Sequence, residues 1–325
     1  MLRQLRLNEP LTTLAGRFWP YALRAVALLV LFRCVWAVLA AAARGELAAE
    51  VATHGLEALA VAAVYLVGHV MRIVRLALLI GNARLSLRRL AAFHLYTAGV
   101  ALGTPVRLGD ANRGIELGLL SGGVVFGITI VWIERLFDLA VLLPLLLVTL
   151  GYASLADHGH AMSAYADITL LTLLFVSLSA LMVAIVPDNL RRFGTYLIRQ
   201  HEGAWTVNAL KGIEDLRRTI NRIPTLIKGK IPSLVVLTVL IWIFEFGSFE
   251  VLMSDGAGSG GGLSGLLAFL SRTTTNGKLP VLLAQLGSLD PFVRMYVVAG
   301  QAPLAIIATA AFFVYASGHG RRNGS

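Results

Sequence analysis

The residues of this chain that could do chemistry are charged side chains set in or beside long apolar stretches. Arg107, Asp110 and Arg113 are three residues apart, a spacing at which opposite charges on one helix can pair. An ionisable side chain within a membrane is costly, so it usually faces a bundle interior or a polar cavity. This triplet is therefore a candidate part of a functional site.

A second charged group lies inside the apolar run 122–150. Glu134 and Asp138 are four residues apart and share a helical face, and Arg135 is three residues from Asp138. The acids and arginines of the two groups are equal in number, so their charges cancel. Small residues just before this group recur at a spacing that permits close helix approach: Gly118, Gly122, Gly123 and Gly127.

Arg72 and Arg75 end an earlier apolar stretch and give the combined cluster two more arginines than acids. Such an excess suits a phosphate or carboxylate, because the planar guanidinium can donate two parallel hydrogen bonds to it. The arginines together with Asp110 are thus predicted to bind an anionic group, with Glu134 and Asp138 serving proton coupling or the network itself. A self-satisfied ion-pair network that only holds helices together is the alternative.

Further charges occur in the second half of the chain. Glu245 and Glu250 lie in the apolar stretch 231–253, and Lys278 lies in a polar interruption further on. These three residues could form an outer counterpart to the first cluster. His158 and His160 beside Asp157 are expected to be solvated rather than to bind a metal.

Composition points to a membrane as the environment of the chain. Of its 325 residues, 57% are hydrophobic and 14% are charged, and the mean hydropathy is +0.76. A soluble domain carries about a quarter charged residues, and the single cysteine, Cys34, excludes a disulfide framework. We therefore expect an all-α, polytopic membrane helical bundle that forms one integral membrane domain over 1–325, with no nucleic-acid partner.

About six stretches are long and apolar enough to cross a bilayer, which takes about 20 residues. They are 21–43, 56–71 running on towards Ile80, 122–150, 167–187, 231–253 and 292–317, the last with a kink expected at Pro303. The first stretch is longer than a signal-peptide core and is expected to be retained.

The charges of the connections predict the orientation. Residues 72–90 carry five arginines and no acid, whereas 151–167 carries two aspartates and no lysine or arginine. Because lysine and arginine gather on the cytoplasmic side, both termini are predicted to be cytoplasmic. The basic stretch 188–230 is predicted to be a cytoplasmic connector between the halves. It consists either of amphipathic helices on anionic inner-leaflet lipids or of an ordinary solvated linker.

Two apolar pieces, 91–121 and 263–291, do not fit this alternation as single crossings. Both are interrupted, the first at Gly103–Pro105 and the second by a polar run that ends at Pro280. We expect two re-entrant helical hairpins that enter from opposite faces, with two full spans at each position as the alternative. Interrupted segments in corresponding halves are typical of a transporter binding site.

The motifs of the first half resemble a known family. The order Arg72…Arg75, then Pro105-x-Arg107-Leu108-Gly109-Asp110-x-x-Arg113, then Glu134-Arg135-x-x-Asp138 is similar to the lysylphosphatidylglycerol synthase transmembrane-region family, also called flippase-like domain proteins. Asp110 stands where the family more often has glutamate. The second half departs from the expected Pro-Gly-Gly-rich stretch and offers Thr273–Asn276, Lys278 and Pro280 instead.

The resemblance implies movement of anionic, aminoacylated or isoprenoid-linked glycolipids across a bacterial cytoplasmic membrane, with glycosyltransferases as possible partners. The chain holds no phosphate loop, no His-Glu-x-x-His, no Gly-x-Ser-x-Gly and no stretch polar enough for an aminoacyl-transferase domain. A non-enzymatic lipid translocator without cofactors is therefore expected. The alternative is a membrane-embedded enzyme or accessory subunit that acts on a lipid-linked sugar.

Overall fold

The computed structural model describes residues 11–81, 86–104, 108–121, 123–155, 159–200, 203–250, 278–289 and 291–320. Within those ranges every regular element is a helix, which confirms the all-α prediction. The described part contains five helices long and apolar enough to cross a membrane: Trp19–Ala43, Gly55–Ile80, Thr169–Arg199, Ile231–Ser248 and Val293–Ser317. The chain is thus a multi-pass helical membrane protein.

These five stretches belong to long elements. They are α1 (Leu11–Ala43), α3 (Gly55–Ile80), α7 (Gly159–Gln200), α9 (Ile231–Glu250) and the succession α12 (Pro291–Met295), η2 (Tyr296–Gln301) and α13 (Ala302–Gly320). The segment η2 is a π-helical turn directly before Pro303, where the sequence predicts a kink. The sixth predicted span, 122–150, forms the helix α6 (Val124–Leu155), which carries three charges and is not one of the five.

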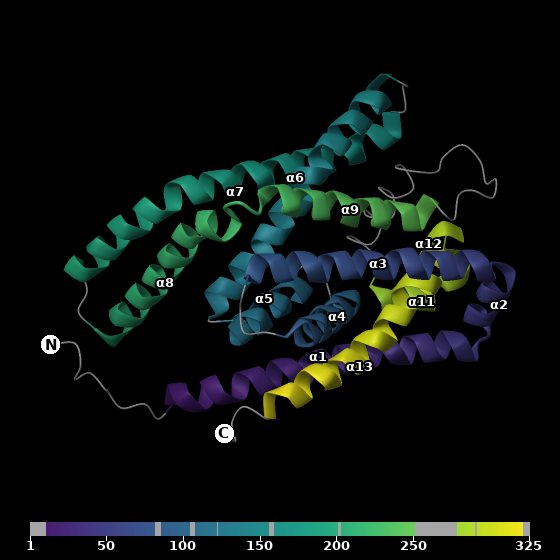
Figure 1. Cartoon of the computed structure of the whole chain (residues 1–325), viewed down its shortest axis with the longest axis horizontal. Coiled ribbons are helices and arrows are strands. Elements are labelled where there is room, and N and C mark those ends of the chain that lie inside the picture. The colour runs from purple at the N-terminus through teal and green to yellow at the C-terminus, as the bar shows by residue number, and fades with distance from the viewer. Residues whose placement is uncertain are drawn as a thin grey trace.

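The helix ends fall at two opposite ends of the bundle (Figure 1). The start of α1, the end of α3, the end of α7, the start of α8 (Ala204–Ile227) and the end of α13 lie at one end, on the left of the view. The short α2 (Glu46–Thr53) and α12 lie at the other.

The first interrupted piece, 91–121, forms two short helices. They are α4 (Leu87–Gly103), whose N-terminus is capped by Ser86 accepting from the Arg89 amide at 3.3 Å, and α5 (Leu108–Ser121). The break between them is where the sequence places Gly103–Pro105. Most of the second piece, 263–291, lies outside the described residues. Its described end holds α11 (Leu279–Ala284) and the short helix η1 (Leu286–Ser288).

Glycine lets α5 and α6 approach each other closely. A Cβ atom on Gly127 would overlap the backbone of Gly114 and Gly118, and a Cβ on Gly118 would overlap the backbone of Gly123 and Val124. The predicted close approach is confirmed at Gly118 and Gly127. An added Cβ on Gly123 would meet nothing within 4 Å, and Gly122 lies outside the described residues.

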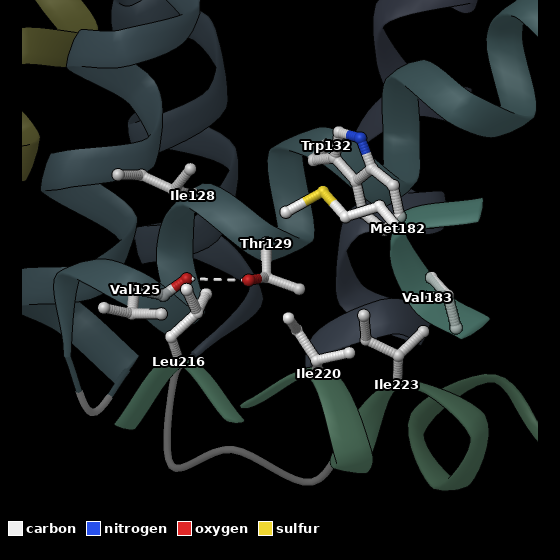
Figure 2. A pocket seen from close by; sticks show the side chains of 9 residues that line it. All are labelled: Val125, Ile128, Thr129, Trp132, Met182, Val183, Leu216, Ile220 and Ile223. Carbon is white, nitrogen blue, oxygen red and sulfur yellow. Dashed lines mark hydrogen bonds between the residues drawn. The ribbon is translucent and has the colours of Figure 1, made fainter. Parts of the chain in front are cut away.

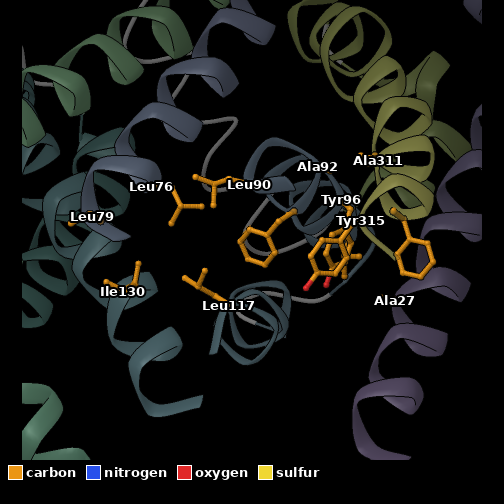
Figure 3. Packing of buried hydrophobic residues seen from close by; sticks show 14 of the residues in the cluster. Ala27, Leu76, Leu79, Leu90, Ala92, Tyr96, Leu117, Ile130, Ala311 and Tyr315 are labelled. Atoms are coloured by element: carbon orange, nitrogen blue, oxygen red, sulfur yellow. The ribbon is translucent and has the colours of Figure 1, made fainter. Parts of the chain in front are cut away.

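The main core lies where α4 packs against α13, α1 and α5 (Figure 3). Its centre is aromatic: the rings of Tyr96 and Tyr315 stack with centroids 5.0 Å apart, and Phe93 packs beside both. Because Gly99 has no side chain, Ala308 of α13 packs directly against the α4 backbone. The broken segment is therefore held deep inside the bundle by side chains on both faces.

The predicted connector 188–230 is divided between the end of α7 and a separate helix, α8. Residues 188–200 continue α7 without a break, and α8 then returns along α7. Leu197, Ile220 and Ile223 are buried there. The stretch is therefore a helical hairpin at the basic end of the bundle, with its apolar side chains partly covered by protein.

Candidate functional site

One buried ion pair joins α3 to α6, and its arginine also contacts α9. The Arg75 side chain is 3% exposed and donates through both Nη atoms to the Asp138 carboxylate. Its Nη1 also donates to Thr238 Oγ1 at 3.0 Å, and the Trp242 indole donates to the Asp138 carbonyl oxygen at 3.2 Å. The helical spacing of α6 turns Asp138 inward, where α3 and α9 supply its partners.

Glu134 lies one turn before Asp138 and sits between two arginines. Its carboxylate is 2.9 Å from Arg113 Nη2 on α5 and 3.9 Å from Arg75 Nε, and its side chain is 2% exposed. The Nε–H groups of Arg75 and Arg113 have no hydrogen-bond acceptor among the described residues. The predicted juxtaposition of the two charged groups is therefore present in the structure.

The third ion pair, unlike the first two, is partly exposed at the protein surface. Arg135 on α6 donates from Nε and Nη2 to the two carboxylate oxygens of Asp110 on α5, at 3.0 and 2.6 Å. Its Nη1 lies 3.5 Å from Asp138, so the pair is continuous with the buried network. The side chains of Arg135 and Asp110 are 47% and 31% exposed, far more than those of the other pairs in this network.

The fourth pair corrects one prediction. Glu245 does not form a separate outer cluster, because it accepts from Arg72 at 2.8 Å and from the Tyr296 hydroxyl at 2.7 Å. Tyr65 packs edge-on against the Tyr296 ring. Since α9 packs along α3, Glu245 is brought to the same helix that carries Arg75, and the network extends through α3 to η2.

The remaining predicted site residues stand apart from these pairs. Lys278 is half-buried directly before α11, and α11 packs against α4, so the described ends of the two interrupted segments are neighbours. Arg107 and the Glu250 side chain lie outside the described residues. Asp157, His158 and the His160 side chain also lie outside the described residues. The described part of the chain holds no cluster of three or more metal-ligating side chains.

Glu245 changes the charge balance of the cluster. In the described part of the network Arg72, Arg75, Arg113 and Arg135 face four carboxylates, those of Asp110, Glu134, Asp138 and Glu245. Glu245 offsets one of the two excess arginines of the prediction, and the other, Arg107, lies outside the described residues. Among the described pairs each arginine has a carboxylate partner, as in the alternative interpretation.

Sequence reasoning missed a buried ion pair outside this network. Arg24 of α1 donates to both carboxylate oxygens of Glu116, at 3.0 and 3.2 Å, and the Tyr315 hydroxyl donates to the same carboxylate at 2.8 Å. Glu116 is fully buried. The available signal was the same one that marked Glu134, namely a charge inside an apolar run: Arg24 falls within 21–43, and Glu116 within 91–121.

Sequence reasoning also did not predict that two histidines lie in contact. His69 Nδ1 and His94 Nε2 lie 3.1 Å apart between α3 and α4, and both side chains are buried. Their spacing of 25 residues gives no local periodicity by which the contact could be predicted.

No protein-family model, curated protein or solved structure matches this chain. Its function must therefore be argued from the fold and from these contacts.

Proposed function

We propose that this protein is a flippase-like translocator that moves an anionic, aminoacylated or isoprenoid-phosphate-linked glycolipid across a bacterial cytoplasmic membrane. The observation that carries the proposal is the half-exposed Arg135–Asp110 pair, which joins the broken α4–α5 segment to the buried network. Broken helices within a membrane are tolerated where protein buries them or where they line a polar cavity, and in transporters they mark the substrate site.

The proposed topology has α6 as a sixth span, α4–α5 as a hairpin entering from the cytoplasmic side, and 263–291 as a hairpin entering from outside. Two observations support it. Arginines and lysines of α8 and of the turn after it lie at the bundle end where α1 begins and α13 ends (Figure 1). The described end of the second interrupted segment, α11, packs against α4 of the first.

The proposed step is an exchange of partners. A phosphate can replace the Asp110 carboxylate on Arg135, because both anions accept two parallel hydrogen bonds from a guanidinium. The described network has no net charge, so an incoming anion needs a compensating positive charge. Protonation of Asp110, Glu134 or Asp138 would supply it, and so would approach of Arg107 or Lys278.

The resemblance of the Arg72–Asp138 motifs to the lysylphosphatidylglycerol synthase transmembrane-region family supports the same class of function. The enzyme alternative needs a free carboxylate as general base. All four carboxylates of the described network are instead paired with arginine.

Reconstitution in liposomes tests the proposal. Fluorescently labelled phosphatidylglycerol, aminoacyl-phosphatidylglycerol and isoprenoid-phosphate lipids are supplied, and movement is read from the fraction that an external quencher reaches. We expect accelerated exchange of at least one anionic lipid and its loss in Arg113→Ala and Glu134→Gln. Bare-liposome rates for every lipid, or full activity in both variants, would overturn the proposal.

A further inference from the structure

A pocket of about 290 Å³ lies between α6, α7 and α8, outside the ion-pair network. Figure 2 shows Val125, Thr129 and Trp132 of α6, Met182 of α7, and Ile220 and Ile223 of α8 among the side chains around it. Small-molecule sites start at about 300 Å³, so the volume suits a slender ligand.

The pocket offers almost no polar group to a ligand. Thr129 is the one hydroxyl of its lining, and that hydroxyl donates to the Val125 carbonyl oxygen of its own helix at 2.8 Å (Figure 2). The other lining side chains are aliphatic, apart from the thioether of Met182 and the indole of Trp132. The chemistry that fits such a lining is hydrocarbon.

Cations flank the α8 side of the same pocket. The apolar residues of α8 that line it recur at helical spacing, and Arg217 and Arg222 fall on either side of that stripe, at 100° per residue. Glu214 pairs with Arg217 and Arg218, whereas Arg222 is exposed and has no ion-pair partner in the described part of the chain. Over Ala204–Ile227 basic residues outnumber acidic ones, so this rim favours an anion.

We propose that this pocket binds the hydrocarbon chain of an anionic phospholipid whose phosphate lies against Arg222. Helix α8 lies at the basic end of the bundle (Figure 1), so a lipid of that leaflet can place its headgroup at α8 and its chain between α6 and α7. The site goes beyond the proposed translocation, since it is separate from the Arg135–Asp110 pair and its occupancy does not require transport.

Quenching of Trp132 by brominated lipid tests the site. A single-tryptophan variant keeps Trp132 and replaces the other four tryptophans with phenylalanine, and a matched variant keeps only Trp36, which is 65% exposed on α1. Both are reconstituted in phosphatidylcholine vesicles with a small fraction of chain-brominated phosphatidylglycerol or chain-brominated phosphatidylcholine.

We expect Trp132, and not Trp36, to be quenched more by brominated phosphatidylglycerol than by brominated phosphatidylcholine. Arg222→Gln should lower that preference roughly fivefold. Equal quenching of Trp132 by both lipids would mean that the pocket holds bulk lipid only. Absence of quenching by either would mean that it is closed to lipid. Each of these two outcomes overturns the proposal.

A second measurement covers the case in which the tryptophan replacements disturb the fold. Native mass spectrometry of the otherwise unaltered protein counts phosphatidylglycerol retained from mixed-lipid nanodiscs. Val183→Phe fills the pocket and should lose retained lipid, whereas Leu181→Phe, on the same helix but outside the lining, should keep it. Equal retention in both variants contradicts the proposal, and neither result depends on lipid movement.

Discussion

At the scale of single residues, exposure separates the arginines of the network into two kinds. Arg75 and Arg113 are buried against their carboxylates, so removing either one leaves a buried acid with only a longer contact, 3.5 Å for Asp138 or 3.9 Å for Glu134. Loss of one partner of a buried pair costs up to about 3–5 kcal/mol. Arg135 is half-exposed and its replacement leaves Asp110 close to solvent or lipid headgroups. Arg135 is therefore the position of the network at which function can be tested with the smallest loss of stability.

Glu214 gives a prediction about pH outside the spans. Hydrogen bonds from Arg217 and then Arg218 lower the pKa of Glu214 from 4.5 to about 2. Because the acid is stronger in the folded helix, its stabilisation of α8 is complete above about pH 4.5 and is lost as the pH falls towards 2. The effect is small because these side chains are solvated.

Hydrogen exchange of the α8 amides checks this prediction. Protection in the wild type should fall through that pH interval, and Glu214→Gln should start lower and stay flat. Asp215→Asn is the control, since the neighbouring carboxylate forms no ion pair among the described residues, and it should retain the wild-type profile. A flat wild-type profile would contradict the role given to Glu214.

At the scale of elements, the α5–α6 contact depends on Gly127. A methyl group there would meet the Gly114 and Gly118 backbone, so we expect Gly127→Ala to separate the helices and lower stability by about 1–3 kcal/mol. Gly151→Ala on the same helix is the control, because nothing lies within 4 Å of its added Cβ. It should be neutral or raise stability by up to about 1 kcal/mol.

Thermal unfolding in detergent measures both variants. The Gly127 variant should also lose the Arg135–Asp110 pair, since those residues sit on the two helices that would separate. Equal melting temperatures for the two variants would show that the close approach is not needed for stability.

The same elements show what the sequence can and cannot predict. Helical periodicity within α6 predicted that Glu134 and Asp138 share a face, and the apolar runs predicted the helices themselves. The partners of these charges depend on packing between distant helices: Arg72 and Glu245 are 173 residues apart, and Arg24 and Glu116 are 92 apart. No local pattern encodes such contacts, and for that reason Glu245 was assigned to the wrong cluster and Glu116 was missed.

At the scale of the whole molecule, the proposed topology predicts which positions meet water on each side. After replacement of Cys34, Thr53→Cys should react with an impermeant thiol reagent from outside and Asn208→Cys only from inside, since these positions lie at opposite ends of the bundle. Cysteines within 105–112 and within 273–278 should react from opposite sides. Reaction of both segments from one side would refute the two-hairpin arrangement.

The central claim is that Arg135 takes an anionic lipid headgroup in exchange for Asp110, and two variants test it most directly. Arg217 on α8 matches Arg135 outside the network: it is 34% exposed and donates through Nε and Nη2 to both oxygens of Glu214. Lipid movement in liposomes is compared for Arg135→Gln and Arg217→Gln at equal protein density and equal melting temperature. The account predicts at least tenfold slower movement of the anionic lipid in Arg135→Gln, the loss of about 1.4 kcal/mol, and the wild-type rate in Arg217→Gln. Equal rates in the two variants would contradict it.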